Sequence, residues 1–252
     1  MSADARYLVA VTRGLSPDAL AGAAGLRGST LRILALGELQ AVVCDVDLDE
    51  FGEEPLRRNL EDLSWVEEMA RAHHAAVNAV AAIGTTVPMR FATIYESDER
   101  VAEQLASLRG DLVVALDRVE GCAEWSVKVY AVEHPPAGTS EQSPQSGSAY
   151  LMGKREALRR RREREDSDAA VLSRLHQTLT TDAVASRMLR PQDPRLTQQH
   201  DPMRMNAAYL VSEAATESFL ESAHHSLRDH QDLRVEVGGP WPPYSFASLE
   251  PT

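Results

Sequence analysis

Four closely spaced acidic residues in the first half of the chain are a candidate group for holding a metal ion. They are Asp45, Asp47, Asp49 and Glu50. Their carboxylate oxygens are the ligands that Ca²⁺ prefers. A calcium loop of the EF-hand type also needs a glycine at its sixth position and a glutamate at its twelfth, and both are missing here. The sequence therefore predicts an acidic turn exposed to solvent.

Histidines and cysteines are the other side chains that bind metals or act as nucleophiles. His73 is followed by His74, and neighbours on a helix point about 100° apart, so the pair cannot chelate one ion. The His-Glu-x-x-His pattern of a metal-binding helix is absent. Cys44 and Cys122 are the only cysteines and are too far apart in sequence to predict a zinc site or a redox pair. We therefore expect packing roles for these residues, with no metal and no cofactor.

Glycine-rich and nucleophile motifs also fail to indicate an enzyme. Gly22, Gly25 and Gly28 lack both the spacing and the following Lys-Ser/Thr of a phosphate loop. The chain contains no Gly-x-Ser-x-Gly elbow and no Cys-x-x-Cys. We expect no catalytic activity, although scattered acid–base residues that converge in the fold stay open as an alternative.

Composition places the chain among acidic globular proteins. It has 252 residues, 43% of them hydrophobic, and a formal net charge of −12. This charge disfavours general binding to nucleic acid or to anionic membranes. No apolar run approaches the roughly 20 residues needed to cross a bilayer, and the N-terminus shows no secretory pattern. We expect a cytoplasmic protein.

Periodicity in the first half predicts an α+β domain over residues 1–133. The expected elements are a central strand at 6–12, a short helix opened by Ser16-Pro17, a hairpin of 31–36 with 39–46, a helix at 55–83, an extended stretch at 87–95, a helix at 99–119 capped by Asp98, and a strand at 124–133. This order is consistent with a ferredoxin-like domain that carries an added helix and strand.

The second half predicts a linker and a helix-rich α+β domain. Residues 134–148 have the Pro, Gly and Ser content of a linker, so the second domain spans 149–252. We expect a charged helix from about Tyr150, a loop at 191–202, a strand at 205–212, a helix at 216–230 and a strand at 233–237. Arginines gather at 159–164 in the charged helix. They favour a solvated face, because nearby glutamates partly neutralise them, and binding to nucleic acid or to an acidic partner is the alternative.

The closing stretch, residues 237–246, is the most unusual part of the chain. Aromatic side chains are concentrated there, although they make up only 5% of all residues. A glycine pair and three prolines are expected to stop regular strand pairing. Two interpretations follow. The rings close the core of the last domain, or they form a rigid patch that docks onto a partner.

Four blocks of sequence resemble the gas vesicle protein F/L family. They are Val87-Pro-Met-Arg-Phe-Ala-Thr-Ile-Tyr, Glu124-Trp-Ser-Val-Lys-Val-Tyr, Ala149-Tyr-Leu-Met-Gly-Lys-Arg and Gly239-Pro-Trp-Pro-Pro-Tyr-Ser-Phe. They occur in the family's order, and the last is the most specific. The chain departs from the pattern in a long polar loop at 190–202 and in Ala92, where glycine is common.

The resemblance implies a non-enzymatic accessory protein of gas vesicle formation with two α+β domains. Such proteins are thought to bind the small hydrophobic shell protein or other accessory proteins, and F-type and L-type roles both stay open. We hypothesise a partner-binding surface formed by residues of the closing stretch and of the strand at 124–133. These residues are Trp241, Pro242, Pro243, Tyr244, Phe246, Trp125, Lys128 and Tyr130.

Overall fold

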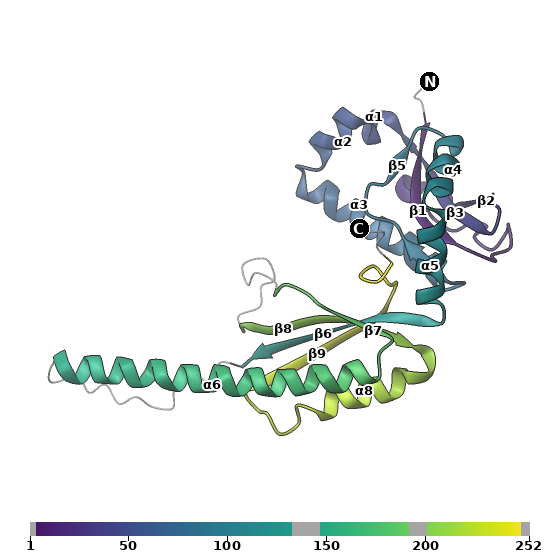
Figure 1. Cartoon of the computed structure of the whole chain (residues 1–252). Coiled ribbons are helices and arrows are strands. Elements are labelled where there is room, and N and C mark those ends of the chain that lie inside the picture. Colours follow the sequence, from purple (N-terminus) through teal and green to yellow (C-terminus); the bar gives the residue numbers. More distant parts are fainter. Residues whose placement is uncertain (1–3, 133–146, 192–200, 248–252) are drawn as a thin grey trace. The chain divides into compact units, whose positions relative to one another are not determined.

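The computed structural model describes residues 4–132, 147–191 and 201–247, which belong to two compact units (Figure 1). The first unit holds residues 1–124 and 240–252, and the second holds 125–239. These units differ from the predicted domains 1–133 and 149–252, because the chain leaves the first unit after Glu124 and returns to it at Pro240. Most of the predicted linker, 134–146, lies outside the described residues, while Gly147 and Ser148 begin a helix.

The sheet of the first unit is built around β1 (Asp4–Thr12), as the sequence predicts. Strand β3 (Leu39–Asp47) pairs with one edge of β1, and β4 (Thr86–Pro88) and β5 (Ile94–Tyr95) pair with the other. Strand β2 (Arg32–Leu36) forms the predicted hairpin with β3. A strand paired on both edges and covered on both faces needs apolar side chains at nearly every position, and β1 has them.

The predicted helix at 55–83 is two helices, α2 (Glu53–Asn59) and α3 (Leu63–Ala81). A further short helix, α1 (Leu48–Phe51), precedes them, and Gly52 is extended between α1 and α2. Asp62 is extended before α3 and accepts hydrogen bonds from the backbone N–H groups of Ser64 and Trp65, which caps the new helix. Continuous apolar periodicity concealed the break at Asp62.

The predicted helix at 99–119 is also divided, into α4 (Asp98–Ser107) and α5 (Arg109–Val119). Leu108 leaves the helical conformation, with φ −101° and ψ 8°. Ser97 rather than Asp98 caps α4, because the side chain of Ser97 accepts the N–H of Arg100. The short helix expected after Ser16 is wrong as well, since the described backbone there forms successive turns with hydrogen bonds three residues apart.

One face of this sheet packs against α3. Apolar periodicity in the predicted helix places one stripe at Leu60, Leu63, Val66, Met69, His73, Val77 and Val80. Of this stripe, Met69, His73, Val77 and Val80 are buried, together with Trp65, which the stripe did not include. Leu63, which the stripe included, is instead 84% exposed. The apolar face of α3 has therefore turned relative to the predicted one at the start of the helix.

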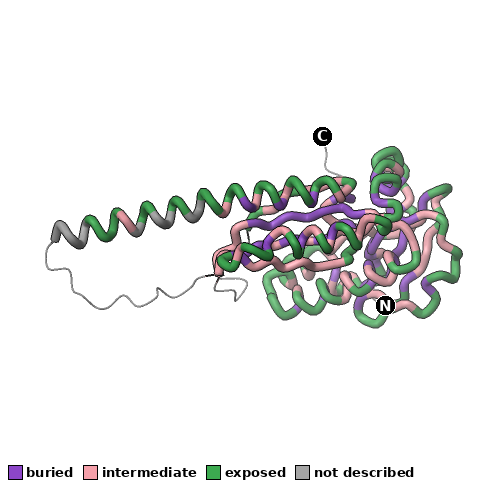
Figure 2. Tube along the Cα trace, turned by 90° about the horizontal axis from the view of Figure 1, so that it is seen from below, coloured by how far each residue is buried: buried purple, intermediate pink, exposed green. Residues whose placement is uncertain are grey.

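The second unit is a four-stranded sheet with helices on one face (Figure 1). Its strand order is β7-β8-β6-β9, and the strands are β6 (Cys122–Ala131), β7 (Ala185–Met188), β8 (Met203–Ser212) and β9 (Leu233–Trp241). Alternate residues of β6 and β8, such as Val127 and Tyr209, share a core with α6 (Gly147–Thr181) and α8 (Thr216–His225). Figure 2 shows this burial concentrated in the strands.

Several expectations for the second unit change. The strand predicted to complete the first domain is β6, and it belongs to this sheet. Strand β9 continues through Gly238, Gly239 and Pro240 instead of ending at Val237. A 3₁₀ turn, η2 (Glu213–Ala215), precedes α8, which ends at His225, and strand β7 was not predicted. Residues 192–200, most of the predicted loop, lie outside the described part of the chain.

Candidate partner-binding surface

The closing segment, residues 240–247, completes the core of the first unit rather than that of the last predicted domain. Pro242, Pro243 and Phe246 are buried. The segment forms tight turns with internal hydrogen bonds, such as the one that the Ala247 N–H donates to the Pro243 carbonyl at 2.9 Å. The Glu124 carboxylate accepts the backbone N–H and the hydroxyl of Ser245, both at 2.7 Å. These two bonds tie the returning chain to the residue at which it left the unit.

The segment lies against a buried histidine, His73. The Tyr7 hydroxyl accepts the N–H of Ala92 at 2.8 Å and lies 3.1 Å from Nδ1 of His73. The hydroxyl keeps a proton and a second acceptor lone pair for this contact, so Nδ1 either accepts or donates according to the tautomer of the ring. Burial lowers the pKa of His73 to about 4, against the opposing effect of the Met89 backbone. The ring is neutral at pH 7.

Aromatic rings surround this histidine. Tyr7 and Phe91 lie edge-on to it, with ring centroids 5.7 and 6.0 Å away. Tyr244 lies 6.3 Å from His73 and stacks on His74 at 6.2 Å with an interplanar angle of 28°. Burial raises the pKa of Tyr244 to about 12, so its phenol stays protonated. The arrangement packs the segment and offers no charged group for catalysis.

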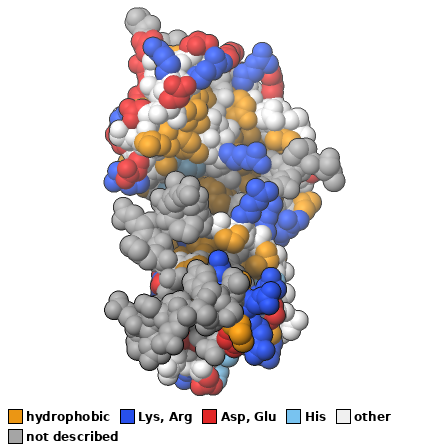
Figure 3. Space-filling model, turned by 90° about the vertical axis from the view of Figure 1, so that its left-hand side faces the viewer, with side chains coloured by type: hydrophobic (Ala, Val, Ile, Leu, Met, Phe, Trp, Pro, Cys, Tyr) orange, Lys and Arg blue, Asp and Glu red, His pale blue; other side chains and the backbone are white. Residues whose placement is uncertain are grey.

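Trp241 is the part of the closing segment that solvent reaches. Its ring is 43% exposed and lies 5.8 Å from that of His74. On the same side of α3, at steps of four, four and three residues before His74, lie Ala70, Val66 and Leu63. Ala70 and Leu63 are exposed and Val66 is half-buried. We call Leu63, Val66, Ala70, His74 and Trp241 the α3 strip. Figure 3 shows hydrophobic side chains gathered on the α1 to α3 side of this unit.

The other predicted binding residues lie on β6 in the second unit, and two of them are not accessible. Trp125 is buried in the core shared with α6 and α8. Tyr130 is also buried, with the guanidinium of Arg234 4.6 Å above its ring. Lys128 is half-exposed. Trp125 and Tyr130 lie five residues apart and so face opposite sides of the sheet, and both are covered, as are Pro242, Pro243 and Phe246 in the closing segment. Partner binding by the predicted set stays a prediction, and Trp241 is its exposed large aromatic side chain.

The acidic residues at 45–50 lie at the end of β3 and in α1 rather than in a turn, and Asp45, Asp47 and Asp49 are exposed to solvent as predicted. Asp45 pairs with Arg6 and Arg32, and Asp47 caps α1 through the N–H of Asp49. Glu50 binds Arg27 and accepts the indole N–H of Trp65 at 2.6 Å. Among the described residues, no three His, Cys, Asp or Glu side chains converge on a metal position.

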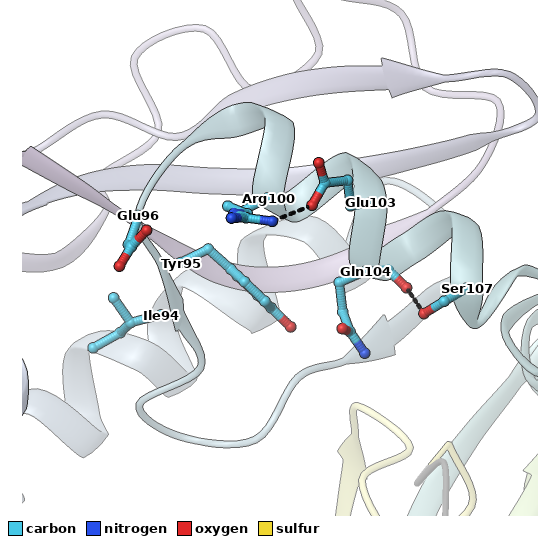
Figure 4. A pocket seen from close by; sticks show the side chains of 7 residues that line it. All are labelled: Ile94, Tyr95, Glu96, Arg100, Glu103, Gln104 and Ser107. Atoms are coloured by element: carbon cyan, nitrogen blue, oxygen red, sulfur yellow. Dashed lines mark hydrogen bonds and ion pairs between the residues drawn. The ribbon is translucent and has the colours of Figure 1, made fainter.

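An open depression of about 540 Å³ lies between β5 and α4 (Figure 4). Its lining residues are Ile94, Tyr95, Glu96, Arg100, Glu103, Gln104 and Ser107. Arg100 is neutralised by Glu103 at 2.7 Å, and Ser107 donates to the Gln104 carbonyl at 2.8 Å. The lining thus lacks an activated nucleophile or base, and we assign no reaction to it. None of the helices in the described segments is both long and apolar enough to cross a bilayer.

Sequence reasoning missed Leu63 and His74 as members of an exposed surface. Leu63 was assigned to the buried stripe, and only its place directly after the Asp62 cap could have shown that it lies at a helix end. Ala92 carried a clearer signal. It has φ +61°, the left-handed region that favours glycine, at the position where the resemblance expects one.

Solved structures with this fold come from gas vesicle proteins. GvpF from Anabaena sp. PCC7120 superposes with a TM-score of 0.68 at 18% identity, covering 99% of this chain and 100% of that one. GvpF from Microcystis aeruginosa gives 0.66 at 16% identity, covering 97% and 99%. At these identities the likeness establishes the fold, and it confirms the predicted α+β class.

Sequence comparisons establish the family. Gas vesicle protein L of Streptomyces sp. (strain CB03234) is 38% identical over 254 residues, covering 97% of this chain and 93% of that protein. Gas vesicle protein F of the same strain is 26% identical over 258 residues, covering 95% and 98%. A family profile described as "Gas vesicle synthesis protein GvpL/GvpF" matches residues 5–248. The chain therefore belongs to the GvpL/GvpF family of gas vesicle proteins.

Proposed function

We propose that this protein is a non-enzymatic accessory factor of gas vesicle formation that binds the small hydrophobic shell protein before assembly, alone or with other accessory proteins. Membership in the GvpL/GvpF family supports the accessory role. The observation that carries the binding proposal is the α3 strip, which has the 84% exposed Leu63 near the start of α3 and the 43% exposed Trp241 against His74, eleven residues further along the helix. Both are large apolar side chains on one face of a single unit.

The physical argument concerns exposed apolar surface. A small protein with a large apolar face aggregates unless another surface covers it. Tryptophan is enriched among the residues that dominate binding energy at protein interfaces. The Trp241 ring lies against the ring of His74, and Tyr244 stacks on the same histidine. Because the Trp241 ring is already held in place, docking of a partner onto it costs little side-chain entropy. An exposed but immobilised ring suits a contact that must form repeatedly during assembly.

The test is capture of the tagged shell protein by the full chain and by two variants of the α3 strip, Trp241→Ala and Leu63→Ser. Val114→Ser is the matched control, because Val114 is also apolar and 57% exposed but lies on α5, outside the strip. We expect each strip variant to lower capture about tenfold and the control to leave it unchanged. Undiminished capture by both strip variants would remove the strip from the interface.

Nucleic-acid binding through residues 159–164 is the alternative function. Arg159 lies 3.7 Å from Glu156 and 3.3 Å from Glu163, so acidic side chains interrupt this basic stretch. A gel shift with duplex DNA at low and at physiological salt tests this alternative, since phosphate contacts predict an affinity that falls steeply with salt.

A further inference from the structure

Among the described side chains of α6, those that pack into the core of the second unit lie in its C-terminal part. Val171, Leu175 and Leu179 are buried at four-residue steps, and His176 Nδ1 lies 2.7 Å from the Tyr209 hydroxyl. From Met152 to Ala170, every side chain that the structure describes is exposed or half-exposed. That stretch corresponds to about 28 Å of helix at 1.5 Å per residue. Figures 1 and 2 show α6 continuing past the end of the sheet, with this part mostly exposed.

A helix that is polar on all sides needs an explanation, because tertiary packing usually supplies most of a helix's stability. Strong helix-forming residues, chiefly Arg, Glu, Leu and Ala, fill residues 152–165. Pairing of Arg159 with Glu156 and Glu163 adds a few tenths of a kcal/mol for each pair. The segment is thus able to persist as a helix with one or more faces free for a partner.

The charge of this segment is opposite to that of the whole chain. Residues 154–164 contain seven basic and two acidic side chains, whereas the chain carries a formal net charge of −12. Six of those seven basic residues are arginine. The guanidinium group binds carboxylates through two parallel hydrogen bonds, and arginine is favoured over lysine in interface ion pairs.

Apolar side chains accompany these arginines. Met152 is 71% exposed and Leu158 is 51% exposed. Methionine and arginine are both enriched in protein interfaces, whereas contacts to a phosphate backbone need only the cations. These features favour a protein partner over a nucleic acid.

We propose that the projecting part of α6, residues 152–170, is a docking arm for an acidic protein surface. Arg159 and Arg162 pair there with carboxylates, and Met152 and Leu158 supply the apolar contact. This inference does not rest on the shell-protein proposal, since it concerns a different unit and a different chemistry.

Fluorescence anisotropy with the full chain tests the arm. The probe is a labelled synthetic peptide that forms an amphipathic helix with glutamate on one face and leucine on the other, and a 20-base-pair DNA duplex is the second probe. The variants are Arg159→Gln with Arg162→Gln, and Met152→Ser with Leu158→Ser. Arg57→Gln with Arg71→Gln is the control, because it removes the same charge from exposed arginines of the first unit.

We expect the acidic peptide to bind, and both α6 variants to weaken it at least tenfold while the control does not. Only the arginine variant should lower the salt dependence of binding. Circular dichroism checks that α6 stays helical in each variant. The proposal is overturned by absence of peptide binding, by equal weakening in the control, or by duplex binding of equal affinity that is lost with the same arginines.

Discussion

Replacing His73 by glutamine should remove a specific pH dependence from the stability of the first unit. His73 is 4% exposed, and burial lowers its pKa to about 4, whereas an unfolded chain protonates histidine near the ordinary value of 6.5. Below pH 6.5 the unfolded state therefore binds a proton that the folded state does not, so stability falls as the pH drops towards 4. Glutamine does not titrate and retains an oxygen that can accept the Tyr7 hydroxyl proton.

The magnitude follows from the two pKa values. Each unit of pKa difference corresponds to 1.36 kcal/mol, so the full effect below pH 4 is about 3 kcal/mol. Between pH 7 and pH 4.5, His73 alone should lower the free energy of unfolding by about 2 kcal/mol. The difference in slope between the two proteins isolates this histidine from the other titrating groups.

Urea titration followed by amide exchange in peptides from α3 reports on the first unit by itself. His224→Gln is the control, because His224 is exposed on α8 in the second unit. We expect the control to keep the wild-type pH dependence in α3. If wild type and His73→Gln lose equal stability between pH 7 and pH 4.5, the buried neutral histidine inferred here is wrong.

Three further predictions concern the burial of the closing segment, the left-handed conformation of Ala92, and the hydrogen bonds from Ser245 to Glu124. Phe246→Ala should lower the free energy of unfolding by about 3 kcal/mol, because it empties a buried site, whereas Trp241→Ala should lower it by less than about 1 kcal/mol. Equal losses of the two variants in urea denaturation would contradict the assigned burial. Ala92→Gly should stabilise the first unit by about 0.5 kcal/mol, since relief of the left-handed conformation outweighs the added chain entropy, and a lowered midpoint in the same assay would contradict this. Glu124→Ala should cost about 2 kcal/mol by removing two hydrogen bonds to Ser245 and should speed proteolysis after the segment; unchanged cleavage would show that the tie is dispensable.

Periodicity and local turn chemistry determined much of the secondary structure. Strand β1, the β2–β3 hairpin and the charged helix α6 follow from side-chain patterns within each stretch, and the GvpL/GvpF signature at residues 239–246 is likewise local. Breaks such as the one at Asp62 were missed because a cap inside continuous apolar periodicity gives only a weak signal.

Tertiary structure decided which elements share a core. Strand β6 looked like the end of the first domain, but its partners β8 and β9 lie far along the chain. Likewise, aromatic composition marked the closing segment without showing that Phe246 is buried in the first unit while Trp241 stays exposed. Local sequence sets propensity and the alternation of faces, whereas strand pairing and burial depend on contacts between distant residues, which only the folded chain brings together.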